Sequence, residues 1–409
     1  MTEASDSQGL VPKLRFPEFR DDGEWVATPL RQLCTPISEK VGNAKLTPVS
    51  ITAGKGFVSQ ASKFGRDISG EQYRNYAYLR KGDFAYNKGN STAFPQGYVC
   101  QLTEFDEAAA SSAFLCFQLS KEHQPRFVQA LFDQNVHGRQ LASFITSGAR
   151  SNGLLNIRSD DFYGVKLPLP PESGEQKKIA ECLSALDARI AAETDKLAAL
   201  RDHKKGLMQQ LFPAEGKTTP RRRFPEFRNV GDWEEKSLGD ICDLRAGRFV
   251  TASDIAGEPA NGLFPCYGGN GLRGYTPSYT HSGTFPVVGR QGAHCGNVKF
   301  VTGKFHATEH AVVATPKSKT SVDWLYHQLV RLELNRFATG QAQPGLSVDV
   351  IERVQCLVPK DEVEQQKIAD CLSTLDALIA EVGYVIDAFN SHKSGLMQQL
   401  FPSPAETIA

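Results

Sequence analysis

The chain has 409 residues, and its 46 lysines and arginines balance 46 aspartates and glutamates. This length suits two domains of about 130 to 150 residues, each with its own core. No run approaches 18 apolar residues, and the polar start MTEASDSQG lacks the apolar stretch of a signal peptide, so we expect a cytoplasmic protein with no membrane partner. The nine cysteines form no C-x-x-C pair, which predicts neither a disulfide framework nor a metal site.

Long parts of the sequence occur twice. RFPEFR begins at residues 15 and 223, EQ-x-K-I-A-x-C-L-S-x-L-D at residues 175 and 364, and GLMQQLFP at residues 206 and 395. The first motif repeats at an offset of 208 and the other two at 189, so the repeats differ in length only between them. We therefore expect an α+β protein with a pseudo-two-fold tandem repeat. Its expected segments are 1–37, 38–170, 171–213, 214–244, 245–357 and 358–409, of which 38–170 and 245–357 are the variable segments.

The residue pattern of the variable segments is typical of β-sheet. Short β-branched and aromatic runs separated by Gly, Asn and Ser predict strands near 82–86, 97–100 and 113–117, and near 284–288, 296–301 and 310–313. A helix is expected after them in each copy, near 125–133 and 322–334. Each variable segment has a net charge of +4, from 15 basic against 11 acidic residues in the first and 11 against 7 in the second.

The conserved segments predict two long helices. Apolar residues recur at alternating steps of four and three, which is a heptad seam. The seam residues are Ile179, Leu183, Leu186, Ile190, Leu197 and Leu200 in the first copy, and Ile368, Leu372, Leu375, Ile379, Val382 and Ile386 in the second. Proline ends each run, at Pro213 and Pro402. Asp361 and Glu364 have the spacing of a capping box. The pattern favours a coiled coil of the two helices, with separate docking of each helix on its own domain as the alternative.

Glycine-rich loops follow equivalent strands in the two copies, at 87–90 and 289–292, and further ones lie at 148–153, 267–275 and 339–345. Such loops suit DNA, because Arg and Lys bond guanine edges, Asn and Gln bond adenine edges, and glycine lets the backbone approach phosphate. His306, Glu309 and His310 match the H-x-x-E-H pattern of zinc enzymes. Their flanks read as strand, which would hold the two histidines about 13 Å apart, so we expect His306 to be a loop-tip contact or a solvated side chain.

The order and duplication of RFPEFR, EQ-x-K-I-A-x-C-L-S-x-L-D and GLMQQLFP resemble the specificity subunit of type I restriction-modification systems over essentially the whole chain. The resemblance implies that 38–170 and 245–357 are target recognition domains, each reading one half of a bipartite DNA sequence. It implies that the long helices form an antiparallel spacer on which two methylation subunits dock, with S-adenosylmethionine bound by those subunits. It also allows for a restriction subunit that uses ATP and Mg. The chain itself is expected to be non-catalytic and to bind no cofactor.

Loop position selects the candidate DNA-binding residues, which are Lys88, Asn90, Arg150, Asn152, Asn270, Arg273, Arg290, Gln291 and Gln343. Helices of about 37 residues would span about 55 Å and place the half-site centres roughly 12 to 15 base pairs apart. Two alternatives remain open: a specificity chain of another methyltransferase-based defence system, and a non-catalytic scaffold that binds proteins.

Overall fold

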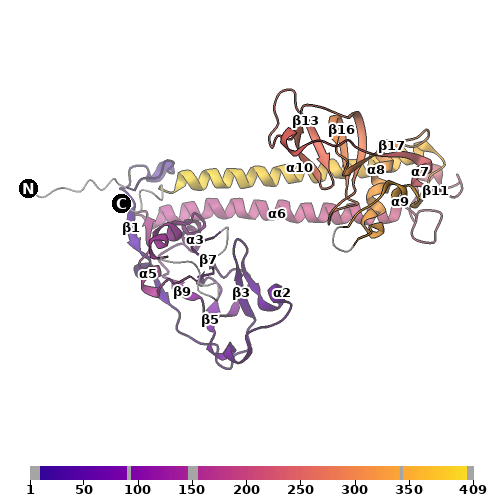
Figure 1. The fold of residues 1–409 in the computed structure, drawn as a ribbon. Coiled ribbons are helices and arrows are strands. Elements are labelled where there is room, and N and C mark those ends of the chain that lie inside the picture. The colour runs from indigo at the N-terminus through magenta and orange to yellow at the C-terminus, as the bar shows by residue number, and fades with distance from the viewer. Residues whose placement is uncertain (1–9, 90–93, 146–154, 341–343, 403–409) are drawn as a thin grey trace, which may run out of the picture. The chain divides into compact units, whose positions relative to one another are not determined.

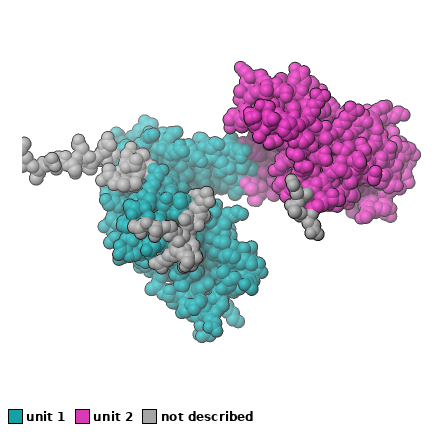
Figure 2. All heavy atoms as spheres, viewed as in Figure 1, with its two compact units in different colours: residues 1–193, 386–409 teal, residues 194–385 magenta. Residues whose placement is uncertain are grey.

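The computed structural model describes residues 10–89, 94–145, 155–340 and 344–402. They form two compact units (Figure 2), of which unit 1 comprises residues 1–193 and 386–409, and unit 2 comprises residues 194–385. Each unit therefore contains one variable segment and a part of both long helices. Within the described ranges, no helix is both long and apolar enough to cross a membrane.

Unit 1 contains two four-stranded sheets, ordered β2-β9-β6-β7 and β4-β3-β8-β5, and a two-stranded sheet of β1 and β10. Its elements are η1 (Pro17–Phe19), β1 (Val26–Pro29), α1 (Leu30–Leu33), β2 (Cys34–Pro36), β3 (Pro48–Thr52), β4 (Gly56–Ser59), α2 (Gln60–Phe64), η2 (Gly70–Asn75), β5 (Ala77–Arg80), β6 (Phe84–Asn87), β7 (Tyr98–Gln101), β8 (Glu107–Ala110), β9 (Leu115–Leu119), α3 (Pro125–Asp133), α4 (Val136–Leu141), η3 (Ala142–Phe144), α5 (Ser159–Tyr163), β10 (Lys166–Leu169) and the first part of α6 (Ser173–Leu211).

Unit 2 contains one six-stranded sheet, ordered β12-β17-β15-β16-β13-β14, and a two-stranded sheet of β11 and β18. Its elements are η4 (Pro225–Phe227), β11 (Glu234–Ser237), α7 (Leu238–Ile241), β12 (Cys242–Ala246), η5 (Ala252–Asp254), β13 (Phe264–Gly268), β14 (Gly271–Thr276), β15 (His281–Gly289), β16 (Val298–Ala307), β17 (Ala311–Pro316), α8 (Val322–Arg331), η6 (Leu334–Phe337), α9 (Val348–Glu352), β18 (Gln355–Val358) and the first part of α10 (Glu362–Leu400).

The six expected strands correspond to β6, β7 and β9 in unit 1 and to β15, β16 and β17 in unit 2. The first expected helix, 125–133, has the bounds of α3, whereas the second was expected to reach residue 334 and ends at Arg331. The backbone of Glu333 takes a left-handed φ of 47°, which an α-helix cannot accommodate, and η6 follows.

Equivalent aromatic residues fill the core of each unit. Trp25 packs against Phe127 and Phe401 in unit 1, and Trp233 packs against Phe212 and Trp324 in unit 2. Each cluster joins the segment after RFPEFR, the helix of the variable segment and the end of one long helix. The repeat in sequence is therefore a repeat in packing.

The long helices run antiparallel (Figure 1). In unit 1, Leu183 of α6 shares a core with Leu400 of α10, so the start of one helix meets the end of the other. In unit 2, Leu211 near the end of α6 shares a core with Leu372 near the start of α10. This is the antiparallel coiled coil of the expected fold class. None of the twelve seam residues is exposed: Ile179, Leu183, Ile368, Leu372 and Val382 are buried, and Leu186, Ile190, Leu197, Leu200, Leu375, Ile379 and Ile386 are half-buried.

The expected capping box at the start of α10 is absent. Asp361 Oδ1 accepts from the backbone N–H of Val363 at 2.9 Å, but Glu364 does not reach back to complete the box. Instead, both carboxylate oxygens of Glu364 accept from the guanidinium of Arg223 at 2.7 Å. The capping box is therefore wrong for a physical reason, because a buried guanidinium binds this carboxylate more strongly than one backbone N–H does.

Candidate nucleic-acid interface

Five chain segments of unit 2 are joined by backbone hydrogen bonds, namely 247–249, 267–273, 289–292, 307–311 and 344–346, and we call them the loop cluster. Backbone hydrogen bonds join them in series. The N–H of Arg248 donates to the carbonyl of Ala307 at 2.8 Å, and that of Thr308 donates to Tyr267 at 2.9 Å. The N–H of Arg290 donates to the carbonyl of His310, and that of Leu346 donates to Arg290, both at 2.9 Å.

Two glycines allow these segments to approach one another. A Cβ atom on Gly289 would lie 2.0 Å from the carbonyl oxygen of Gly269, and one on Gly269 would lie 2.9 Å from the carbonyl oxygen of Gln291. No side chain fits at either position, because real Cβ atoms do not approach backbone so closely. The glycine loops singled out in the sequence therefore pack on each other.

The loop cluster is electropositive. Arg248 and Arg273 are exposed, and Lys299 extends its side chain beside Gly271. Within the described parts of the cluster Glu309 is the one carboxylate, and it pairs with His310 at 3.2 Å. An excess of cations around backbone loops is what phosphate binding requires.

Three polar atoms in the loop cluster are buried without a hydrogen-bond partner, namely Arg290 Nε, Glu309 Oε2 and His310 Nδ1. A buried polar atom without a partner costs roughly 1 to 3 kcal/mol, so such atoms are rare outside sites that a ligand or water completes. They belong to two adjacent loops, because the N–H of Arg290 donates to the carbonyl of His310. The loop cluster thus has hydrogen-bonding capacity that its own residues do not use.

Unit 1 builds the same loop position from different residues. The carbonyl of Lys88 accepts from the N–H of Leu155 at 2.9 Å, as the carbonyl of Arg290 accepts from Leu346 in unit 2. Each bond joins the loop after β6 or β15 to the segment before α5 or α9. Lys88 Nζ also donates to the carbonyl of Ile157 at 3.3 Å. The two units therefore share the frame of the site and differ in its side chains.

A family model described as the type I restriction modification DNA specificity domain matches residues 39–202 and matches again at residues 230–382. The chain belongs to the type I restriction-modification specificity subunits. The EcoprrI specificity subunit of Escherichia coli is 31% identical over 287 residues, which cover 68% of this chain and 69% of that protein. The MjaVIII specificity subunit of Methanocaldococcus jannaschii is 25% identical over 265 residues, which cover 58% of this chain and 61% of that protein.

The fold agrees with this assignment. The crystal structure of a type I S subunit from M. genitalium superimposes with a TM-score of 0.66 at 16% sequence identity, over 96% of this chain and 99% of that one. As a specificity subunit the chain has a role in DNA recognition, and the loop cluster and its counterpart in unit 1 are its candidate contact surfaces.

The structure brings four predicted contact residues of the specificity subunit into the loop cluster, namely Asn270, Arg273, Arg290 and Gln291. It places Lys88 at the equivalent position of unit 1. Asn90, Arg150, Asn152 and Gln343 lie outside the described residues. The sequence reading missed Arg248, Phe249 and Lys299. The sequence around Arg248 and Phe249 carries no pattern that marks them, because their approach to residues 307–311 depends on long-range pairing.

The expectation for His306 of the specificity subunit was wrong. Its side chain is buried, with Nδ1 3.1 Å from the hydroxyl of Ser278 and Nε2 3.1 Å from the carbonyl oxygen of Arg248. The segment is also no continuous strand, because β16 ends at Ala307 and a turn leads into β17. Within the described ranges, no group of three His, Cys, Asp or Glu side chains is placed to hold a metal ion. His306 instead fixes the loop that carries Arg248.

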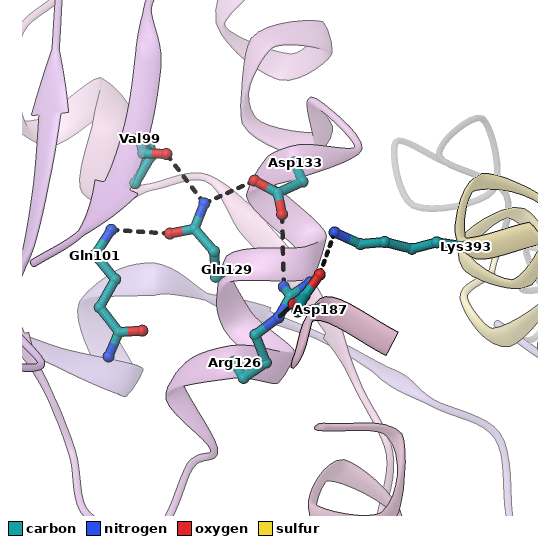
Figure 3. Close-up of polar contacts among 7 residues, drawn as sticks. All are labelled: Val99, Gln101, Arg126, Gln129, Asp133, Asp187 and Lys393. Carbon is teal, nitrogen blue, oxygen red and sulfur yellow. Dashed lines mark hydrogen bonds and ion pairs between the residues drawn. The ribbon is translucent and has the colours of Figure 1, made fainter. Parts of the chain in front are cut away.

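An ionic network holds the recognition domain of unit 1 on both long helices (Figure 3). Arg126 of α3 donates to Asp187 of α6 at 2.8 Å, and Lys393 of α10 pairs with the same carboxylate at 2.5 Å. Gln129 donates to Asp133 at 2.8 Å and also bonds the backbone of β7. The sheet of the domain is thereby connected through α3 to the coiled coil, so loop positions are fixed relative to the helices of the same unit.

Proposed function

We propose that this specificity subunit performs no chemistry and directs DNA methylation by reading a bipartite sequence, one half through each unit. The observation that carries the proposal is that one loop position is built twice with unlike side chains, around Lys88 in unit 1 and Arg290 in unit 2. A shared frame with different side chains suits two readers with different targets. Unlike half-sites need unlike donors and acceptors at the base edges.

We assign the base and phosphate contacts to the candidate DNA-binding residues of the glycine-rich loops. Lys and Arg are suited to guanine O6 and N7, and Asn and Gln to adenine N6 and N7. The contacts assigned to unit 1 are Lys88, Asn90, Arg150 and Asn152, and those assigned to unit 2 are Asn270, Arg273, Arg290, Gln291 and Gln343. The exposed Arg248 and Lys299 add phosphate contacts in unit 2.

The long helices are proposed to set the separation of the half-sites and to dock two methylation subunits, which would bind S-adenosylmethionine. A restriction subunit that uses ATP and Mg would join the same complex. We propose that this complex is cytoplasmic. Exposed apolar side chains on α10 support a docking role. Tyr384 is 75% exposed, and Val363 and Leu378 are also exposed on this helix. Apolar groups on a helix that is otherwise acidic on its exposed side are typical of a surface that a partner covers.

Methylome sequencing tests the proposal. A host strain carrying the chain with its neighbouring methylation subunit is compared with the same strain after deletion of the chain. A methyladenine motif in two parts, separated by unspecified bases and lost on deletion, is the expected result. The half-site centres should lie roughly 12 to 15 base pairs apart, given the length of the helices. A contiguous motif, or a motif that persists without the chain, would overturn the proposal.

Single substitutions then assign the two halves. Lys88→Ala should relax only one half-site and Arg290→Ala only the other, because the two residues lie in different units. Losing one bidentate contact should cost about 1 to 3 kcal/mol of discrimination at one base pair. Unchanged motifs in both variants would remove these residues from the contact set while leaving the bipartite motif itself intact.

A further inference from the structure

Phe249 is the most exposed large apolar side chain in the described part of the loop cluster, with 70% of its surface accessible. Its backbone is held firmly. The N–H of the preceding Arg248 donates to the carbonyl of Ala307, and the carbonyl of Arg248 accepts from His306 Nε2 at 3.1 Å. The following residue, Val250, is buried. The backbone is therefore fixed on both sides of Phe249, and the phenyl ring is held in solvent outside the core of unit 2.

The surroundings of Phe249 indicate which ligand would cover it. Arg248 is adjacent and exposed, Arg273 lies in the same loop cluster, and Oε1 of Glu309 is paired with His310. An apolar ring next to an exposed arginine is poorly suited to an apolar protein surface, because docking there would desolvate the guanidinium. It is well suited to duplex DNA, which offers phosphates at its surface and apolar ring faces inside the base stack.

DNA recognition by this family makes insertion of such a ring useful. Apolar side chains that enter between base pairs unstack one step and kink the duplex. An enzyme that modifies a base within a duplex must take that base out of the stack, and an opened step lowers the cost of doing so. In unit 1 the residue 208 positions earlier is Val41, which is buried and offers no exposed ring at that position.

We propose that Phe249 is an apolar wedge that inserts into the base stack of the half-site read by unit 2, while Arg248 binds the adjacent phosphate. The proposal rests on the proposed function, because it requires that unit 2 bind duplex DNA. It adds a distortion of the DNA that is confined to one of the two half-sites. Phe249 would thus be a positioning residue, which acts on the methylated adenine through the shape of the duplex.

Fluorescence of 2-aminopurine tests the wedge. The complex of the full chain with its methylation subunits binds duplexes that carry the mapped target, with 2-aminopurine placed in turn at each position except the methylated adenine. The wild-type complex should raise the fluorescence at one step of one half-site. Phe249→Ala should abolish that signal and weaken binding between about fivefold and 150-fold, the range expected for one stacked ring. Phe249→Leu should retain most of the signal, because leucine is also an apolar wedge.

A matched control is Phe64→Ala in unit 1, which removes a phenyl ring that is 45% exposed and contacted by Lys63. It should leave fluorescence and affinity unchanged. An unchanged signal in Phe249→Ala would overturn the wedge. Failure of Phe249→Ala to assemble with the methylation subunits, while it still folds, would show that the ring binds protein instead. A wild-type complex without a bipartite motif would refute the proposed function, which is a separate outcome from either of these.

Discussion

Arg15 and Glu175 form a buried bidentate pair that recurs as Arg223 and Glu364, at the joint between the RFPEFR motif and the long helix of each repeat. Both motifs were evident in the sequence as repeats. Their contact was not, because the partners are 160 residues apart in the first copy and 141 in the second. Hydrogen bonding to Glu364 raises the pKa of Arg223 above its usual value, which favours the charged guanidinium.

Replacing Arg223 by methionine tests how much the pair of Arg223 and Glu364 contributes to the free energy of unfolding. The change leaves the Glu364 carboxylate, which is 0% exposed, without its cation, and we expect a loss of about 3 to 5 kcal/mol in the free energy of unfolding. Urea denaturation of the full chain measures it. Lys367→Met is the control, because its pair with Glu226 is exposed and screened by solvent, so its loss should change stability little. Equal losses in the two variants would contradict the prediction.

His327 predicts a pH dependence of stability. Burial lowers its pKa to about 3, and the nearby Lys204 adds to this effect, although Asp376 lies 4.0 Å away. Below the ordinary histidine pKa of about 6.5 the unfolded chain takes up a proton that the folded chain refuses, so stability falls as the pH falls. The loss from this residue should reach about 2 kcal/mol at pH 5.

The test compares unfolding at pH 7 and pH 5. His327→Gln should reduce the acid-induced loss of stability by about 2 kcal/mol relative to wild type, because glutamine takes up no proton. His203→Gln, at an exposed position of α6, is the control and should behave as wild type. The prediction is contradicted if the stability of His327→Gln depends on pH as strongly as that of the wild type.

At the scale of elements, local patterns carried the most information. Heptad periodicity and flanking prolines predicted α6 and α10, and short β-branched and aromatic runs between turn residues predicted β6 and β15. Sheet order was not predictable, since β13 pairs with β16, which lies about 40 residues further along the chain, as well as with its hairpin neighbour β14. The same limit hid Arg248 and Phe249, because the bonds that hold this segment run to residues 306, 307 and 311.

Buried seam leucines should stabilise both repeats by similar amounts. Leu183 and Leu372 are equivalent at an offset of 189 and both are 0% exposed, one in each unit. Leu183→Ala and Leu372→Ala should each lower the free energy of unfolding by about 2 to 5 kcal/mol, because each leaves a cavity in a packed core. Leu378→Ala, on the exposed side of α10, should cost about 0.5 kcal/mol or less. A seam variant no worse than this control would show that its helix face is not packed.

At the scale of the whole molecule, the end of each long helix makes the same contact with the start of a repeat. The N–H of Arg222 donates to the carbonyl of Gln210 at the end of α6, where the chain passes directly from the first repeat into the second. The N–H of Leu14 donates to the carbonyl of Gln399 at the end of α10 in the same way, although no peptide bond connects these segments nearby. Phe212 and Phe401 then occupy equivalent aromatic clusters.

This equivalence predicts that the chain tolerates circular permutation. The permutant is opened between Phe212 and Arg222, and a flexible linker joins residue 402 to residue 10. It should keep the core contacts of both units. After opening, the bond from Arg222 to Gln210 would hold its joint without a nearby peptide connection, as the bond from Leu14 to Gln399 already does. We expect the permutant to direct methylation to the same bipartite motif as the original order, as methylome sequencing would show. A control permutant opened within α8, whose residues Trp324 and Leu325 are buried, should lose the half-site of unit 2. If the first permutant also loses a half-site, the prediction is wrong, and the peptide connection at residues 212–222 is itself required for DNA recognition.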